Sequence, residues 1–186
     1  MSAIALVRHG RTPWNAARRI QGSTDIRLDD VGRSQALTAA AALAGAEDWS
    51  AVVSSPMARA RETAEIIAAS LGLPLLDPVG ALVERDCGVA EGLTVDEAHA
   101  RWPDLDYPGA EPTEAAGLRT ALAIARIEAS TPRAIVVGHG QALRHGIAAL
   151  TGSPAERIAN AEVIVLERTG EPGVPTDWRR SVVARA

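Results

Sequence analysis

The sequence contains no lysine, and all 19 of its basic residues are arginine. Lysine-dependent chemistry is therefore excluded, whether it uses a P-loop lysine, a Schiff-base lysine or a pyridoxal anchor. This absence removes most nucleotide kinases and aldolase-type enzymes. The sequence also has a single cysteine, Cys87, which excludes an intramolecular disulfide framework and gives no thiolate metal cluster.

Long apolar runs and a large excess of one charge are missing as well. No apolar stretch is long enough to span a membrane, and residues 1–7 carry no basic segment ahead of a signal-peptide core. The net charge of −4 gives no support for nucleic-acid binding. We therefore expect a cytoplasmic protein with no nucleic-acid or membrane partner. The 186 residues, 47% hydrophobic and 23% charged, fit a single domain over residues 1–186.

Strand-like and helix-like segments alternate along the chain. Strands are predicted over residues 3–7, 49–54, 134–137, 161–166 and 178–183. Helices are predicted over residues 12–20, 31–44, 55–71, 114–129 and 141–150. This order is typical of a parallel sheet covered on both faces. We predict a three-layer α/β/α fold with a mostly parallel central sheet.

Local signals place some of the boundaries. Asp30 is expected to cap the helix that follows it, and residues 94–97 have the spacing of a capping box at the start of a short helix. Residues 82–84 close a short extended piece. A turn rich in glycine and proline around residues 171–173 is expected to join the last two strands.

The first predicted strand leads into Arg8, His9 and Gly10. Gly10 lets the backbone turn, Thr12 can cap a helix, and Pro13 suits its first position. A cation and an imidazole thus meet free N–H groups at the positive end of a helix dipole, which favours an anion. Imidazole is mostly neutral and nucleophilic near pH 7. We interpret the anion as a phosphoryl group and His9 as its acceptor.

A second His-Gly pair follows another predicted strand. The run over residues 134–137 leads through Gly138 into His139 and Gly140. In an open parallel sheet, ligands bind at the carboxyl ends of the strands. We therefore expect His9 and His139 to share one site.

Arg59 is a candidate cation for the same site. It lies one turn into the helix expected to begin at Ser55 and Pro56, so its side chain can reach back over the helix N-terminus. With Arg8 it can hold phosphoryl oxygens through forked, charge-assisted hydrogen bonds, and fixed cations stabilise a transferring phosphoryl group. Taken alone, Arg59 resembles an ordinary helix charge such as Arg61.

Phosphoester cleavage also needs an acid for the leaving oxygen and a base for water. Glu84 precedes a glycine-containing loop and is one candidate; Glu91 competes with it, and spacing alone does not choose between them. His9, His139 and Glu84 are also metal-ligand types. However, no HExxH motif or closely spaced histidine pair occurs, and two nearby arginines would repel a cation. A metal site is the weaker hypothesis.

Four motifs in a fixed order resemble those of the histidine phosphatase superfamily, in its phosphoglycerate-mutase-like branch. They are RHGRTPWN at residues 8–15, SPMARARETA at 55–64, the pattern L-x-E-x-x-x-G-x-x-E-G at 82–92, and VVGHG at 136–140. The similarity extends from residue 4 to about residue 144. The resemblance implies a phosphoglycerate-mutase-like α/β/α fold and a reaction that needs no metal or other cofactor.

The resemblance also assigns roles to individual residues. It implies that His9 becomes the phosphohistidine and that Glu84 donates and accepts the proton. The remaining positions bind the phosphoryl group (Arg8, Arg59 and His139) or the substrate (Asn15, Thr12, Gln21, Gly22 and Gly140).

Two positions depart from the family pattern. Glu62 stands where glutamine is common, which we expect to place a carboxylate near Arg59. Gln141 replaces a frequent glycine and changes the expected floor of the pocket. Cys87 is not the nucleophile of a cysteine phosphatase, because the arginine needed six residues later is Leu93, and we expect a packed thiol.

Charge favours hydrolysis over phosphoryl exchange. A mutase must hold a bisphosphorylated intermediate, and the related mutases use a longer insertion with extra cationic groups. Residues 93–113 are expected to form a short lid, and Arg101 is the only basic residue in it. We therefore expect a phosphatase that acts on a small phosphorylated metabolite. Arg85 follows Glu84 as in mutases, so phosphoglycerate-mutase-type transfer is the alternative. A non-catalytic phospho-ligand binding module is a third, since a fold alone does not prove a function.

Overall fold

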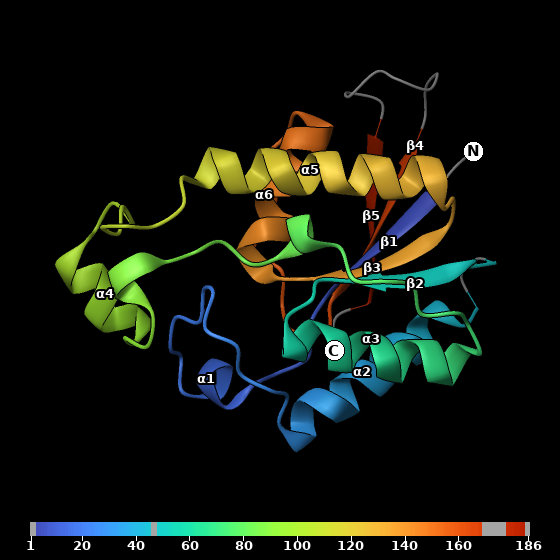
Figure 1. Cartoon of the computed structure of the whole chain (residues 1–186), viewed down its shortest axis with the longest axis horizontal. Helices are drawn as coiled ribbons and strands as arrows, with labels where there is room; N and C mark the ends of the chain where they lie inside the picture. The colour runs from blue at the N-terminus through green and yellow to red at the C-terminus, as the bar shows by residue number, and fades with distance from the viewer. Residues whose placement is uncertain (1–2, 46–47, 169–177, 185–186) are drawn as a thin grey trace.

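The computed structural model describes residues 3–45, 48–168 and 178–184. Within these ranges the chain forms a five-stranded sheet with the order β2-β3-β1-β4-β5 (Figure 1). The strands are β1 (Ala3–Arg8), β2 (Ala51–Ser54), β3 (Ala134–Gly138), β4 (Val163–Arg168) and β5 (Trp178–Ala184). β1, β2 and β3 are parallel, whereas β4 pairs antiparallel with β1 and β5. All five predicted strands are present. The turn predicted at residues 171–173 lies outside the described residues.

The register of the sheet brings the two His-Gly pairs together. β1 and β3 are direct neighbours, and Arg8 is paired with Gly138. The His9 N–H donates to the Gly138 carbonyl at 3.0 Å, so the pairing continues one residue past β1. His9 and His139 therefore leave the sheet side by side at the carboxyl ends of their strands, as predicted.

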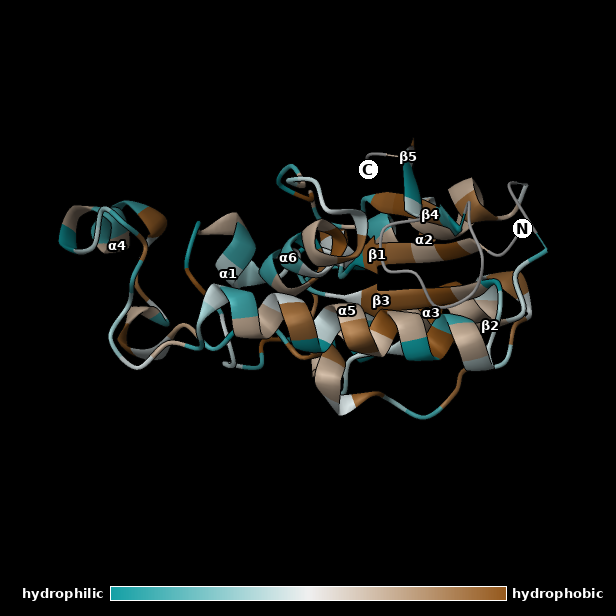
Figure 2. Cartoon of the chain, turned by 90° about the horizontal axis from the view of Figure 1, so that it is seen from above, coloured by the Kyte–Doolittle hydropathy of each residue, from teal (hydrophilic) through white to brown (hydrophobic). Residues whose placement is uncertain are grey.

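Helices cover both faces of the sheet. In Figure 1, α5 (Thr113–Ser130) and α6 (Gly140–Thr151) lie on one face, and α2 (Asp30–Leu43) and α3 (Ala58–Leu71) lie on the other. Successive strand residues point to opposite faces. Ile4 and Leu6 of β1 accordingly join the core under α5 and α6, whereas Ala5 and Val7 join the core under α2 and α3. β1 and β3 are hydrophobic along their length (Figure 2). The predicted three-layer α/β/α fold is confirmed.

The segment between α3 and α5 first hydrogen-bonds to β2 and then extends away from the sheet (Figures 1 and 2). It contains two 3₁₀ turns, η1 (Gly80–Leu82) and η2 (Gly88–Ala90), and the helix α4 (Val95–Arg101). Thr94 caps α4 through the predicted capping box with Glu97. The prediction of an extended piece over residues 82–84 is wrong at its start, because Leu82 ends η1. A lid function for residues 93–113 stays a prediction.

Three predicted helix boundaries are also wrong. α1 covers Pro13–Ala16 instead of continuing to residue 20, because Arg18 adopts a left-handed φ of 52° that a right-handed helix cannot contain. Asp29 rather than Asp30 caps α2. α3 begins at Ala58 rather than at Ser55. No helix within the described residues is long and apolar enough to cross a membrane.

Candidate active site

His9 is a buried, neutral imidazole at the end of β1. Its Nδ1 lies 2.7 Å from the Gly10 carbonyl oxygen, which can only accept a hydrogen bond. The hydrogen therefore resides on Nδ1, and Nε2 keeps its lone pair. Burial, followed by the charges of Arg8 and Arg59, lowers the pKa of His9 well below 6.5. The ring is consequently uncharged and nucleophilic at neutral pH.

The turn after β1 is fixed by close backbone packing. A Cβ on Gly10 would lie 2.3 Å from the Gly32 carbonyl oxygen, so residue 10 must be glycine for the chain to pass α2 at this distance. The Gly10 N–H donates to the Thr63 hydroxyl at 3.1 Å. Thr12 then caps α1, where its hydroxyl accepts from the Asn15 N–H at 3.2 Å. The conformation of His9 is thus held on both sides.

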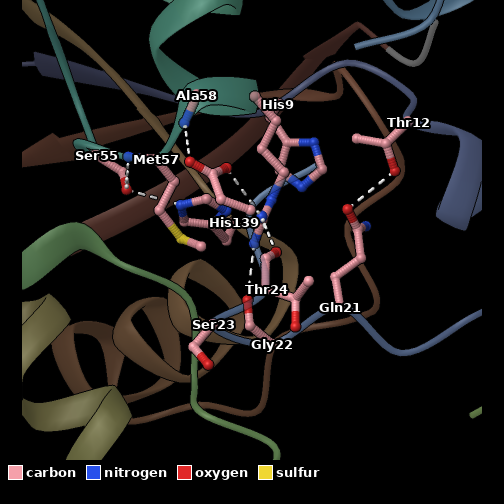
Figure 3. Close-up of polar contacts among 12 residues, drawn as sticks. His9, Thr12, Gln21, Gly22, Ser23, Thr24, Ser55, Met57, Ala58 and His139 are labelled. Carbon is pink, nitrogen blue, oxygen red and sulfur yellow. Dashed lines mark hydrogen bonds and ion pairs between the residues drawn. The ribbon is translucent and has the colours of Figure 1, made fainter. Parts of the chain in front are cut away.

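His139 lies beside His9 and directly precedes α6. The two ring centroids are 5.3 Å apart and the rings are tilted by 58° (Figure 3). The His139 Nε2 is 2.8 Å from the Ser55 hydroxyl, which accepts from the Met57 N–H at 3.3 Å. The hydroxyl hydrogen of Ser55 can therefore point at Nε2, which leaves the ring hydrogen on Nδ1. Burial, followed by the charge of Arg59, lowers the pKa of His139 well below 6.5.

Arg8 contributes a buried guanidinium. Its Nη1 donates to the Ile158 carbonyl at 2.8 Å, while its Nε is buried without a hydrogen-bond partner. Burial lowers the pKa of Arg8 to about 10, and the carboxylate of Glu84 opposes this shift. A Cβ on Gly140 would lie 3.2 Å from the Arg8 Nε, so the glycine at the start of α6 allows the Arg8 side chain to pack closely against this helix.

Arg59 is fully buried in the first turn of α3. Its guanidinium donates to the carbonyls of Thr24 at 2.8 Å and Gly22 at 2.9 Å, and its Nε is buried without a partner. Burial lowers the pKa of Arg59, with the carboxylates of Glu84 and then Asp25 opposing the shift. Arg61, in contrast, forms an ion pair with Glu65 at 3.1 Å on the outer side of the helix. The structure therefore separates the two arginines that the sequence alone did not.

Three buried donors around the two histidines have no hydrogen-bond partner among the described residues: the Nε of Arg8, the Nε of Arg59 and the Nδ1 of His139. Buried polar groups are almost always hydrogen-bonded, and leaving one unpaired costs about 1–3 kcal/mol. Both arginines lie close enough to His9 and His139 for their charges to lower the pKa of each ring. Unpaired donors next to a neutral imidazole have the chemistry that a tetrahedral anion such as a phosphoryl group requires.

Glu91 organises the loop that holds Arg59. Its carboxylate accepts from the Ser23 N–H at 2.6 Å and hydroxyl at 2.9 Å, from the Thr24 N–H at 2.9 Å and hydroxyl at 2.5 Å, and from the Cys87 N–H at 3.1 Å. Burial opposes ionisation, but these hydrogen bonds lower the pKa of Glu91. Glu91 is therefore a structural carboxylate that shapes residues 22–24.

Glu84 has different surroundings. Its carboxylate accepts from the N–H groups of Arg85 at 2.9 Å, Gln141 at 3.1 Å and Ala142 at 2.8 Å, so it lies against the positive end of α6 next to His139. Glu84 also lines a cleft of about 420 Å³. The lining residues are Ser23, Asp25, Pro56, Met57, Val83, Glu84, Asp86, Glu111 and Arg119. Glu84 thus combines a position in the cleft with contacts next to His139, whereas Glu91 is not among the residues that line this cleft.

The remaining predicted substrate residues form a network beside His9. The Thr12 hydroxyl donates to the Gln21 side-chain oxygen at 2.9 Å (Figure 3). The Asn15 side-chain oxygen accepts from the Thr12 N–H at 3.2 Å and from the Asn160 amide at 3.0 Å. Gly22 has a φ of 52° and supplies the carbonyl that holds Arg59. Direct substrate contacts by Thr12, Asn15, Gln21, Gly22 and Gly140 stay predictions.

The two departures from the family pattern are explained by their contacts. The Glu62 carboxylate pairs with the Arg33 Nε at 2.7 Å, whereas the Arg59 guanidinium donates to the carbonyls of Thr24 and Gly22. Gln141 supplies an N–H to Glu84 and accepts from Arg85 at 3.3 Å.

Cys87 is buried beneath this region as a packed thiol. Burial raises the pKa of the Cys87 thiol to about 12, which makes it a poor nucleophile. The prediction that it is not a catalytic cysteine agrees with this environment.

Sequence reasoning did not identify Ser55, Asn160 and Arg119. Ser55 directly follows β2, whose carboxyl end lies at the same sheet edge, and this position was an available signal. Arg119 lies in the middle of α5, and its spacing within the helix gives no indication of its partners.

Comparison with known proteins identifies the family. The family model for the histidine phosphatase superfamily, branch 1, matches residues 4–180. An uncharacterized phosphatase, PhoE, from Bacillus subtilis is 36% identical over 167 residues, which cover 87% of this chain and 86% of the relative. A metal-independent phosphoserine phosphatase from Arabidopsis thaliana is 35% identical over 193 residues, which cover 96% and 81% of the two chains.

One solved structure has the same fold over nearly the full length of both chains. It is a mycobacterial glucosyl-3-phosphoglycerate phosphatase in complex with VO3, and it superposes with a TM-score of 0.84 at 27% identity over 98% of each chain. The sequence match and the fold lead to the same conclusion: the chain belongs to the histidine phosphatase superfamily, branch 1.

Proposed function

We propose that this protein hydrolyses a small phosphomonoester in two steps, with His9 as the acceptor of the phosphoryl group. The observation that carries the proposal is the neutral His9 ring, with its lone pair on Nε2, beside three buried donors that lack a partner. The relatives named as phosphatases support the same reaction class.

In the first step, Nε2 of His9 attacks phosphorus and the bond to the ester oxygen breaks. Arg8, Arg59 and His139 donate to the phosphoryl oxygens and stabilise their charge. Glu84 in its acid form gives its proton to the leaving oxygen. Its carboxyl group lies against the main-chain N–H groups of Arg85, Gln141 and Ala142, next to His139.

In the second step, Glu84 takes a proton from water as the water oxygen attacks phosphorus. The bond between phosphorus and His9 breaks, inorganic phosphate leaves, and both residues return to their starting states. Splitting the transfer in this way replaces one difficult step by two easier ones. His9 and His139 follow β1 and β3, and Glu84 contacts the start of α6 directly after His139, which supports this order of steps.

The cleft favours hydrolysis over a mutase reaction. Asp25, Asp86 and Glu111 line it, and the arginine in its lining, Arg119, forms a two-point ion pair with Glu111 at 2.7 Å and 2.7 Å. Arg85, the feature shared with mutases, donates to the Glu111 carbonyl at 2.7 Å and lies 5.7 Å from the centre of the Tyr107 ring. These engaged cations are not available to bind a second phosphoryl group.

The substrate is accordingly a small phosphorylated metabolite that fits a cleft of about 420 Å³. The absence of a metal or other cofactor and a cytoplasmic location are also part of this proposal. A non-catalytic module is disfavoured, because His9 and Glu84 are both present and share the site.

The direct test compares wild type with His9→Ala on p-nitrophenyl phosphate and on a panel of metabolite monophosphates. Loss of the covalent nucleophile should reduce kcat by roughly four orders of magnitude or more. Substantial turnover by pure His9→Ala protein would refute the proposal. A parallel assay of phosphoglycerate interconversion would identify a mutase.

A further inference from the structure

Arg119 uses its entire hydrogen-bonding capacity at one place. A guanidinium carries five N–H donors. Two of them donate to the Glu111 carboxylate at 2.7 Å and 2.7 Å. The other three donate to main-chain carbonyls, those of Ala81 at 2.9 Å, Val83 at 2.7 Å and Glu84 at 3.1 Å. All five donors therefore bind the protein itself.

The three carbonyls belong to Glu84 and the residues just before it. Ala81 lies in the 3₁₀ turn η1, and Val83 and Glu84 follow it. None of the three belongs to the sheet, so no strand ladder fixes their main chain. Arg119 supplies the missing hydrogen bonds from α5. At the other end of the residue, the Glu84 carboxylate is held by the N-terminus of α6 through Gln141 and Ala142. Glu84 is thus fixed between two helices, by its main chain on α5 and by its side chain on α6.

Glu111 also binds the main chain and side chain of the residues that follow Glu84. Its N–H donates to the Asp86 carbonyl at 3.0 Å, and its own carbonyl accepts from the Arg85 Nε at 2.7 Å. The hydrogen bonds from Arg119, which outweigh partial burial, lower the pKa of Glu111 and keep it ionised. The ion pair is only partly exposed, with side-chain exposures of 23% and 22%. It therefore orients Arg119 toward residues 81–84.

We propose that Arg119, oriented by Glu111, is a positioning residue that holds Glu84 at the distance required for proton transfer. This proposal rests on the acid–base role of Glu84 in the proposed function. Proton transfer requires a heavy-atom separation of about 2.6–3.2 Å, and a shift of about 1 Å can cost on the order of a hundredfold in rate. Arg119 lines the cleft, but its bonds assign it to Glu84 rather than to the substrate.

The test uses two substrates that differ in their need for an acid. Propyl phosphate has a basic leaving oxygen, whereas p-nitrophenolate leaves without much help. Arg119→Met should lower kcat on propyl phosphate on the order of 10- to 100-fold, as loss of a supporting group around an active residue commonly does. The loss on p-nitrophenyl phosphate should be severalfold smaller, and KM should change little. Arg126→Met is the matched control, because Arg126 is exposed on the same helix, and it should leave both rates unchanged.

A double-mutant cycle then separates positioning from general destabilisation. If Arg119 acts through Glu84, adding Arg119→Met to Glu84→Gln should have almost no further effect on propyl phosphate turnover. A full additive loss in the double variant, or an equal loss on both substrates in Arg119→Met, would overturn the proposal. Should Arg119→Met fail to fold, Glu111→Gln removes the orienting charge and must show the same substrate dependence.

The same data distinguish this proposal from the proposed function. If wild type hydrolyses neither substrate, the phosphatase assignment fails and the role of Arg119 fails with it. If Glu84→Gln shows the leaving-group dependence and Arg119→Met does not, only the role of Arg119 fails.

Discussion

Glu84 and Glu91 are seven residues apart, and the structure predicts opposite consequences for the same change at each. Glu84→Gln keeps the size of the side chain but cannot transfer a proton. General acid–base catalysis contributes about 10²–10⁴ in rate, so turnover of propyl phosphate should fall by that factor. Turnover of p-nitrophenyl phosphate should be limited instead by water attack, and the phosphorylated enzyme should accumulate.

Glu91→Gln should destabilise the loop over residues 22–24 and leave proton transfer intact. The Glu91 carboxylate accepts five hydrogen bonds from Ser23, Thr24 and Cys87, and an amide oxygen can accept about two of them. Because the site is partly exposed, water replaces some of the loss, and we expect about 2 kcal/mol of destabilisation. That corresponds to a drop in Tm of about 4–8 °C for a chain of this size.

The assay measures both variants on both substrates, together with Tm. Glu91→Gln should raise KM on both substrates by the same factor, because the carbonyls of Gly22 and Thr24 hold Arg59 less firmly. The assignment of the two glutamates is refuted if Glu91→Gln shows the leaving-group dependence and the trapped intermediate while Glu84→Gln shows neither.

Three further predictions follow from the site. Arg59→Ala should lower kcat/KM about a hundredfold or more, whereas Arg61→Ala, on the outer side of α3, should change it little; equal losses would mean that the wrong arginine was chosen. His9 and His139 have lowered pKa values, so below pH 6.5 the unfolded chain binds more protons than the native state. The free energy of unfolding should therefore fall as pH drops from 6.5 toward 5.5, by up to about 2.7 kcal/mol per pH unit for the pair, and denaturant titrations with a flat profile would contradict this. Excess chelator should leave turnover intact, and a loss that zinc or magnesium restores would revive the metal hypothesis.

The fold and the centre of the site could be predicted because their signals are local. Short apolar runs that lead into His-Gly pairs predicted β1 and β3. The carboxyl ends of parallel strands lie at the same edge of a sheet. The two histidines are therefore adjacent because each follows one of these strands, and the sequence shows that position. Arg59 was separated from Arg61 by family resemblance, and the structure supplies the physical reason in its burial.

What could not be predicted depends on contacts between distant residues. Glu84 differs from Glu91 because its carboxylate meets the N–H groups of α6, 57 and 58 positions along the chain. Arg119 reaches Glu84 across 35 positions from the middle of a helix. The end of α1 was predicted wrongly for a different reason. The residues around Arg18 favour a helix, and nothing in their sequence indicates the left-handed φ that Arg18 adopts.

The most direct test of the mechanism is to locate the phosphoryl group on the enzyme. Glu84→Gln protein is mixed with p-nitrophenyl phosphate, quenched rapidly, and digested for mass spectrometry under conditions that preserve acid-labile phosphate. We predict a burst of about one nitrophenolate per active site and a phosphoryl group on His9. No burst, or a phosphoryl group on Ser55 or Cys87 in place of His9, would contradict the account.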